Sequence, residues 1–215
     1  MKGSALGPSR GASADRPQRP LPGADAPLLD PEVARVLREN RAALRRSYIK
    51  SRSGIPLTAE DYEVRPLDKE RIRNAIQIPD DAGELAPALE AMLRRVPGPW
   101  TRTVGCDRGW YPLVAQLDHD LAQLDPGYIV HQVKEKFGAL RLYFEGAPEV
   151  AEEMQAVVDA AMEASRDICE LCGAPGMFME GWFRVKTLCP KCGIREGLLP
   201  VEFSPWAEEI GPLEI

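Results

Sequence analysis

The amino-acid sequence predicts an α+β protein with a helical N-terminal and middle region, then an antiparallel β-hairpin, then a C-terminal cysteine ribbon. Three observations predict this order. Apolar residues recur at helical spacing in several segments before residue 125, and they alternate as in strands over residues 128–145. Four of the five cysteines lie in two C-x-x-C pairs near the C-terminus. With 44% apolar and 28% charged residues, the chain has the composition of a globular protein with a buried core.

The N-terminal segment has the composition of a disordered arm. Residues 1–29 contain five prolines and four glycines and little that could form a core, so we expect them to be disordered. They also lack the apolar run of a secretory signal, and no stretch of the chain approaches the roughly eighteen apolar residues of a membrane span. We therefore expect a cytoplasmic protein with no membrane contact.

A basic amphipathic helix is predicted to follow this arm, within a region of helical segments over residues 30–100. Asp30 is a suitable N-cap, and Pro31 fits the first turn of a helix. Apolar residues at helical spacing and a row of arginines then indicate a helix over residues 31–50. The apolar residues are Val33, Val36, Leu37, Leu44 and Tyr48, and the arginines are Arg35, Arg38, Arg41, Arg45 and Arg46.

Charge is distributed unevenly along the chain. The net charge of −6 argues against a protein that coats nucleic acid through its overall field. Residues 31–52 nevertheless carry seven basic and two acidic side chains, whereas residues 80–126 carry eight acidic and four basic ones. We interpret this as a basic segment that folds against an acidic body. The alternative is a basic arm, with Arg38, Arg41 and Arg45 as contacts, for nucleic acid or an acidic partner.

Four more helices and one hairpin are predicted from periodicity and turn residues. Residues 101–165 should form a helix–hairpin–helix core, and residues 197–215 an acidic tail. The expected helices are a short one after Asp68 and those over residues 82–95, 111–124 and 148–165. The expected strands are residues 128–137 and 139–145.

The most specific signal is the pair of C-x-x-C motifs within residues 166–196. Sixteen residues separate the motifs, enough for a short hairpin with a turn at Glu180–Gly181. Four thiolates can complete the tetrahedral coordination of Zn²⁺, and no position is then left for a reactive water, so we predict a structural zinc ribbon. The predicted ligands are Cys169, Cys172, Cys189 and Cys192.

Two other uses of these cysteines remain as alternatives. Two disulfides would suit a secreted miniprotein, but the chain begins with no export signal. A redox pair normally opens a helix, whose dipole lowers the pKa of the thiol, whereas Cys169 follows one. Both alternatives fit the sequence less well than zinc.

Three segments resemble a family of small uncharacterised bacterial and bacteriophage proteins. They are "CDRGWYPL" at residues 106–113, "QVKEKFGALRLYF" at 132–144, and "SRDICELCGAPG" with "GWFRVKTLCPKC" over 165–192. The resemblance covers roughly residues 104–193. It implies a helix, a VKEKFG hairpin, a second helix and a zinc knuckle, and it implies no activity. The family often ends in C-x-x-H, and here Cys192 occupies that last position, which zinc accepts.

The sequence offers little support for an enzyme. His119 and His131 are the only histidines, and the segment between the two cysteine pairs contains no His, Asn or Asp, which argues against an HNH nuclease site. We expect Asp118, His119 and Asp120 to lie on a solvated helix face. We expect His131 to be structural or exposed, and Cys106 to be a small buried residue rather than a nucleophile.

We therefore expect a non-enzymatic zinc-binding interaction module that binds another protein, as an adaptor or an immunity-type inhibitor. A nucleic-acid-binding zinc ribbon that uses the basic helix is the first alternative, and a hydrolase with an unrecognised site is the second. Aromatic and basic residues on one face of the ribbon could contact a partner if the turn lies at Glu180–Gly181; core packing is the competing interpretation. These residues are Phe178, Trp182, Arg184 and Lys186.

Overall fold

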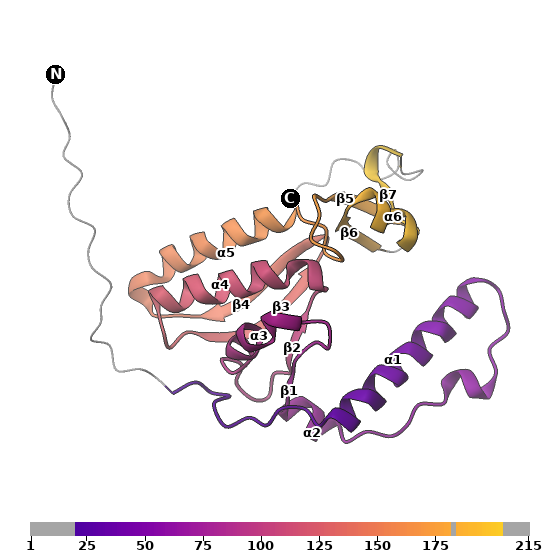
Figure 1. The fold of residues 1–215 in the computed structure, drawn as a ribbon, viewed down its shortest axis with the longest axis horizontal. Helices are drawn as coiled ribbons and strands as arrows, with labels where there is room; N and C mark the ends of the chain where they lie inside the picture. Colours follow the sequence, from indigo (N-terminus) through magenta and orange to yellow (C-terminus); the bar gives the residue numbers. More distant parts are fainter. Residues whose placement is uncertain (1–19, 182–183, 204–215) are drawn as a thin grey trace.

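The computed structural model describes residues 20–181 and 184–203, and its mixed α+β fold confirms the predicted class (Figure 1). Most of the expected N-terminal arm (1–19) and most of the expected acidic tail (204–215) lie outside the described residues. The helices are α1 (Pro31–Arg52), α2 (Lys69–Asn74), α3 (Ala86–Leu93), α4 (Tyr111–Leu124), α5 (Ala151–Ser165) and α6 (Pro190–Glu196). The strands are β1 (Ile76–Gln77), β2 (Arg102–Gly105), β3 (Ile129–Lys136), β4 (Ala139–Glu145), β5 (Met177–Gly181), β6 (Arg184–Leu188) and β7 (Leu199–Pro200).

A four-stranded sheet with the order β1-β2-β3-β4 forms the centre of the body, which we define as residues 76–165. Strands β3 and β4 are the predicted antiparallel hairpin. Their turn contains Phe137 and Gly138, both with positive φ (55° and 73°), as a tight two-residue hairpin turn requires. Strands β1 and β2 are additions to the prediction and run parallel to β3. Helices α3 and α4 supply the crossovers that parallel pairing requires.

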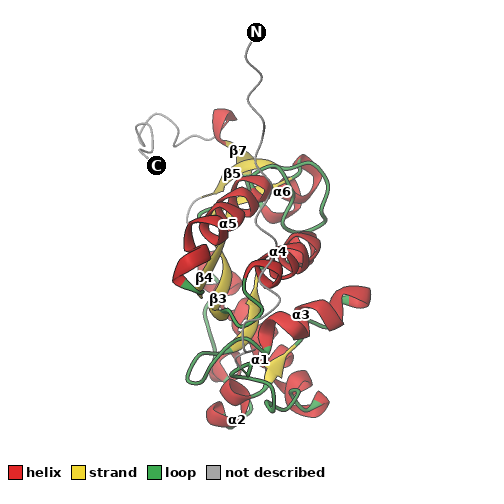
Figure 2. Cartoon of the chain, turned by 90° about the vertical axis from the view of Figure 1, so that its left-hand side faces the viewer, coloured by secondary structure: helices red, strands yellow, loops and turns green. Residues whose placement is uncertain are grey.

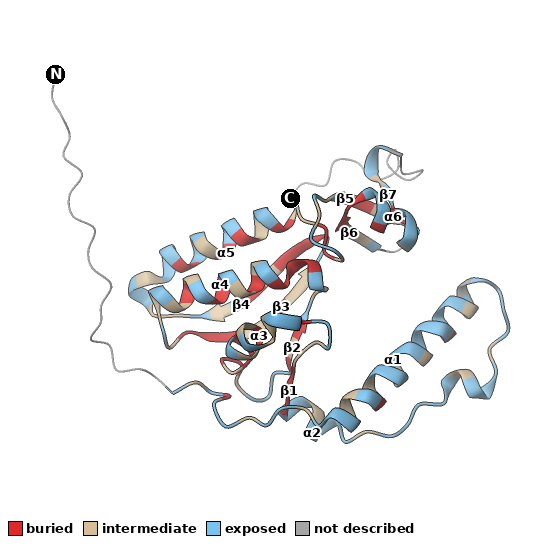
Figure 3. Ribbon diagram, in the orientation of Figure 1, coloured by how far each residue is buried: buried red, intermediate tan, exposed pale blue. Residues whose placement is uncertain are grey.

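Helices α3, α4 and α5 lie side by side and cover the sheet (Figure 2). The core between them is fully buried, as the colours of Figure 3 show along the sheet and the facing sides of the helices. Its largest members include Leu89, Trp110, Leu121, Tyr128 and Met154. A second, smaller apolar cluster of Met179, Leu188 and Leu198 surrounds the cysteines. The body therefore has a core of its own, separate from that of the cysteine region.

Helix α1 and the chain that returns from it form an arm, residues 31–66, which projects from the body (Figure 1). The helix begins as predicted, since the Asp30 side chain accepts hydrogen bonds from the first-turn backbone amides. The returning chain contains a 3₁₀ turn, Ala59–Tyr62, whose Asp61 carboxylate pairs with Lys50 at 2.5 Å. The predicted apolar stripe is only partly covered, because Val36 is buried but Leu44 and Tyr48 are 53% and 59% exposed.

The N-terminal segment predicted to be disordered, residues 1–29, extends too far toward the C-terminus. Residues 20–29 run along the body, where the Gly23 amide donates to the carbonyl oxygen of Arg94 at 2.8 Å. Leu29 and Ile76 also share a backbone hydrogen bond of 2.8 Å, which extends the edge of the sheet beyond β1. Backbone pairing at a sheet edge requires no apolar side chains, so the composition of this segment did not indicate it.

No helix in residues 20–181 and 184–203 combines the length and apolar content needed to cross a membrane.

Candidate metal centre

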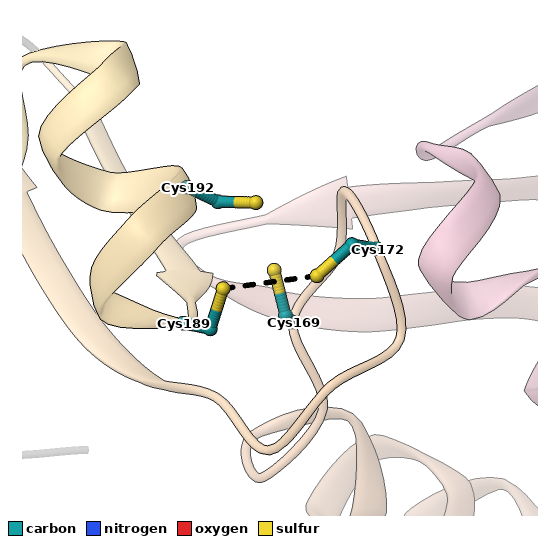
Figure 4. A group of neighbouring side chains, drawn as sticks. All are labelled: Cys169, Cys172, Cys189 and Cys192. Atoms are coloured by element: carbon teal, nitrogen blue, oxygen red, sulfur yellow. Dashed lines mark hydrogen bonds between the residues drawn. The ribbon is translucent and has the colours of Figure 1, made fainter.

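The four cysteines of the two C-x-x-C motifs converge on one point (Figure 4). Their sulfur atoms all lie within 4.8 Å of one another, and the Sγ atoms of Cys172 and Cys189 are 3.7 Å apart. All four are free thiols, so the disulfide alternative is wrong. A tetrahedral ion with bonds of about 2.3 Å to sulfur requires sulfur atoms about 3.8 Å apart. The cluster therefore has the dimensions of a four-thiolate metal site.

Each cysteine pair lies in a tight backbone turn. After α5, the Cys169 amide donates to the Ala174 carbonyl at 2.7 Å, and the Gly173 amide donates to the Cys169 carbonyl at 2.8 Å. Gly173 has a φ of +76°, which a side chain would disfavour. Cys189 is the N-cap residue of α6, and Cys192 lies in its first turn. These turns place two sulfurs from each motif on the side that faces the other motif.

The ribbon, which we define as residues 166–200, differs from the prediction in two respects. Gly181 pairs with Arg184 and Glu180 pairs with Val185, so Glu180 and Gly181 belong to strand β5 and do not form the predicted turn. Strand β7 pairs with β5 on its other side and extends the ribbon beyond the predicted limit at residue 196. Leu198, which we expected in the acidic tail, is buried.

The thiols occupy different electrostatic environments. Burial raises the pKa of Cys169 and raises the pKa of Cys192 to about 12. A hydrogen bond from the Cys192 backbone amide lowers the pKa of Cys189 to about 7. Closely spaced thiolates repel one another, so only a bound cation would allow all four to ionise together.

The ribbon docks on the segment before α4, residues 107–110, through backbone groups. The Gly109 amide donates to the Glu170 carbonyl at 2.7 Å, and the Trp110 indole N–H donates to the Ile168 carbonyl at 2.7 Å. The Glu170 side chain, which is 1% exposed, accepts from the Asp107 amide and pairs with the ammonium of Lys186. Burial raises the pKa of Glu170, and the Lys186 ammonium opposes that shift. A residue of the first cysteine motif thus connects the ribbon to the body.

A second contact joins the ribbon to the β3–β4 turn. The Thr187 hydroxyl donates to the Gly138 carbonyl at 2.6 Å. The Phe178 ring lies directly against Gly138, where an added Cβ would be 3.0 Å from it. The hairpin and the ribbon, both predicted from sequence, therefore contact each other.

The predicted ribbon face for a partner is not formed among the described residues. Cross-strand neighbours in an antiparallel pair share a face. Phe178 pairs with Thr187, whereas Lys186 pairs with Met179, so Phe178 lies on the opposite face from Lys186. Arg184 shares the face of Lys186, but it forms an ion pair of 3.0 Å with Glu196. Trp182 lies outside the described residues.

The predicted contacts of the basic helix have partners within the chain, with one exception. Arg38 pairs with Asp80 at 2.7 Å, and Arg45 pairs with Glu196 at 3.4 Å. Within the described residues, the exposed Arg41 side chain has neither an ion pair nor a hydrogen bond.

The expectation of a solvated face at residues 118–120 is wrong for Asp118. This carboxylate is 8% exposed and accepts hydrogen bonds from Arg95 at 2.8 Å and from the Tyr128 hydroxyl at 2.6 Å. The Arg95 guanidinium also lies over the Tyr128 ring, 4.3 Å from its centroid. Arg95 and Tyr128 were missed because both lie outside helix α4, so the periodicity of that helix could not indicate them. His119 is exposed, as expected for that helix face.

The two remaining candidate residues lie apart from the metal cluster. His131 is half-buried on β3, with its ring centroid 5.9 Å from that of Trp100. Cys106 is half-buried after β2, and burial raises the pKa of its thiol well above the usual range. A protonated thiol is a poor nucleophile, which fits the expected packing role.

Comparison of the chain with protein-family models, with curated proteins and with solved structures gave no match.

Proposed function

We propose that the four cysteines bind Zn²⁺ and that the ion has a structural role. Four thiolates at tetrahedral separation suit Zn²⁺, and four protein ligands close its coordination sphere to a reactive water. The apolar cluster around the cysteines is small, so a bound ion would supply much of the energy that folds the ribbon. The free thiols are consistent with a reducing compartment such as the cytoplasm.

We propose further that the protein is a non-enzymatic module that presents its arm to another protein. The arm carries large apolar side chains that its own fold leaves exposed, and such patches are typical of interaction sites. Leu44 and Tyr48, four residues apart, lie on the same face of α1, as in helices that dock through spaced apolar anchors. The exposed residues are Leu44, Tyr48, Ile49, Ile55, Tyr62 and Val64.

The nucleic-acid alternative has less support. Arg35, Arg38 and Arg45 of α1 are paired with carboxylates of the chain itself, which reduces the positive field that a phosphate backbone would meet. The hydrolase alternative has less support again, because His119 is exposed and Asp118 is held by Arg95.

The zinc proposal is tested by elemental analysis and native mass spectrometry of protein purified without added metal. We expect one zinc per chain, with loss of zinc in Cys169→Ser and in Cys189→Ser. Cys106→Ser is the matched control, because this cysteine is not in the cluster and should leave the zinc content unchanged. A different metal in the wild-type protein, or equal loss from all three variants, would contradict the proposal.

The interaction proposal is tested by site-specific photo-crosslinking in extracts of the cells that produce the protein. A photoreactive residue at position 48 should give a protein adduct, whereas one at the exposed position 119 on α4 should not. Unlabelled wild-type protein should compete for the adduct, and a Leu44→Ser, Tyr48→Ser variant should not. An adduct that nuclease removes would favour the nucleic-acid alternative.

A further inference from the structure

A cleft of about 450 Å³ lies between α1 and the C-terminal ends of β1 and β2. Leu37, Arg38 and Arg41 of α1 line one wall. The other wall contains Thr103 and Val104 of β2, together with residues that follow the two strands. Sheets with parallel strands commonly bind ligands beyond the C-terminal ends of those strands, and β1 and β2 form such a pair.

The charges around this cleft leave one cation without a partner. The Arg38 guanidinium is neutralised by Asp80 at 2.7 Å, and Asp107 lies 3.3 Å from the Lys186 ammonium, which also pairs with Glu170. Arg41, one helical turn from Arg38, has no such partner in the part of the chain that the structure describes. The lining therefore carries two arginines and two aspartates, and Arg41 is the arginine without a carboxylate partner among the described residues. Its guanidinium can bind carboxylates and phosphates through paired hydrogen bonds.

Apolar side chains share the rest of the lining with polar groups. Leu28 and Leu37 contribute hydrocarbon surface to the lining, and the buried Ile76 and Val104 lie beneath it. We propose that the cleft binds a small organic anion, a carboxylate or phosphate group on an apolar body, with the Arg41 guanidinium as the ligand for the charged group. The volume suits a ligand of modest size, and the apolar side chains of the lining would contact its body.

The ribbon contacts the elements that form both walls of the cleft. Asp107 lines the cleft, and its backbone amide donates to the Glu170 side chain at 3.3 Å. On the opposite wall, Arg45 of α1 reaches Glu196 of α6 at 3.4 Å. The cleft and the cysteine cluster are thus separate sites that share a supporting structure, and anion binding depends on neither the identity of the metal nor a partner protein.

The test measures binding of four probes with a common phenyl body to the full-length protein by calorimetry. The anions are 3-phenylpropionate and phenyl phosphate, the neutral probe is 3-phenylpropan-1-ol, and the cation is 3-phenylpropylamine. We expect at least one anion to bind roughly tenfold or more tightly than the alcohol and the amine, because the charged hydrogen bonds to Arg41 need an anion. The anion that binds more tightly identifies whether the site prefers a carboxylate or a phosphate group.

Two variants locate the site. Arg41→Gln should weaken binding of the anion roughly tenfold, whereas Arg46→Gln should change the affinity less than about twofold. Arg46 is a matched control, because it is exposed on the same helix and outside the cleft lining. In NMR spectra the anion should shift the amide signals of Thr103 and Val104. Absence of binding at about 10 mM, equal binding of the alcohol, or equal effects of the two variants would overturn the proposal.

Discussion

The backbone amide of Gly109 donates a 2.7 Å hydrogen bond to the carbonyl oxygen of Glu170, at the point where the body meets the ribbon. The two chains approach so closely here that a Cβ on Gly109 would lie 2.1 Å from the Cys169 carbonyl and 2.5 Å from that of Glu170. Only glycine allows this approach. The position of the first cysteine motif is therefore set by a residue sixty positions earlier in the chain.

Replacement of this glycine should separate the ribbon from the body. We expect Gly109→Ala to destabilise the protein by about 2–4 kcal/mol, since the contacting atoms belong to backbone that cannot move aside without loss of the docking hydrogen bonds. Urea unfolding measures the change. Gly83→Ala is the comparison. Its φ of +54° is unfavourable for alanine, but an added Cβ would have no neighbouring atom within 4 Å. This substitution should therefore destabilise the protein by about 1 kcal/mol. Equal costs would show that the two chains can move apart enough to accept a methyl group at Gly109 without loss of the docking contacts.

A second prediction concerns the buried carboxylate on α4. Arg95→Met removes the cation that pairs with Asp118 at 2.8 Å, and we expect a cost of about 3–5 kcal/mol because a buried charge is left without compensation. Tyr128→Phe removes one hydrogen bond to the same carboxylate and should cost about 1–3 kcal/mol. The double variant Arg95→Met, Asp118→Leu should recover much of the first loss. If it is no more stable than Arg95→Met alone, the ion pair is not what stabilises this site.

A third prediction concerns metal removal. Chelation should unfold the ribbon, since the apolar cluster around the cysteines is small, while the body retains the separate core formed by α3, α4, α5 and the sheet. In hydrogen exchange, amides of β5 and β6 should lose protection and those of β3 should keep most of theirs. Loss of protection throughout would mean that the body depends on the ribbon for its own stability.

Metal binding should also release protons and weaken as the pH falls. The raised pKa values of Cys169 and Cys192 mean that both thiols are protonated at neutral pH without an ion, and a metal must displace those protons. Cys189, with a pKa of about 7, is already partly ionised there. Calorimetry in buffers of different ionisation enthalpy should find at least about two protons released per ion near pH 7. Cys106→Ser should leave that number unchanged.

The elements that the sequence predicted well are those whose signal is local. Helix α4 has the predicted bounds because Pro112 lies in its first turn and Asp125–Pro126–Gly127 follows its end. The β3–β4 hairpin and each of the two cysteine motifs likewise depend on neighbours close in sequence. Strands β1 and β2 escaped prediction because two and four residues are too few to show a period.

The contacts between elements could not be predicted from side-chain pattern. The ribbon docks through the Gly109 amide and the carbonyl oxygens of Ile168 and Glu170. Because almost every residue has these backbone groups, the residue types do not indicate which of them form the contact. Asp118 was assigned to a solvated face because helical periodicity identifies the apolar edge but not a buried polar pair beside it. Its partners, Arg95 and Tyr128, come from segments that only the fold brings together.

The last prediction concerns the arm, which should loosen in acid. The hydrogen bond from Lys50 lowers the pKa of Asp61 below its ordinary value of 3.8. We call the arm closed when this Lys50–Asp61 contact is formed and open when it is broken. The Asp61 carboxylate therefore binds a proton less tightly in the closed arm than in the open arm. The pair therefore stabilises the closed arm above about pH 3.8, and this contribution is lost as the pH falls through the lower pKa of the closed arm.

Hydrogen exchange between about pH 5 and pH 3 measures this change at the Asp61 and Glu63 amides, which donate to backbone carbonyls within the 3₁₀ turn. After correction for the intrinsic pH dependence of exchange, we expect protection of these two amides to fall with pH in the wild-type protein. Asp61→Asn cannot titrate, so it should have low protection at both pH values. If the loss of protection with pH persists in Asp61→Asn, another carboxylate controls the arm, and Glu39, which pairs with Arg65 at the base of the same arm, is the next to replace.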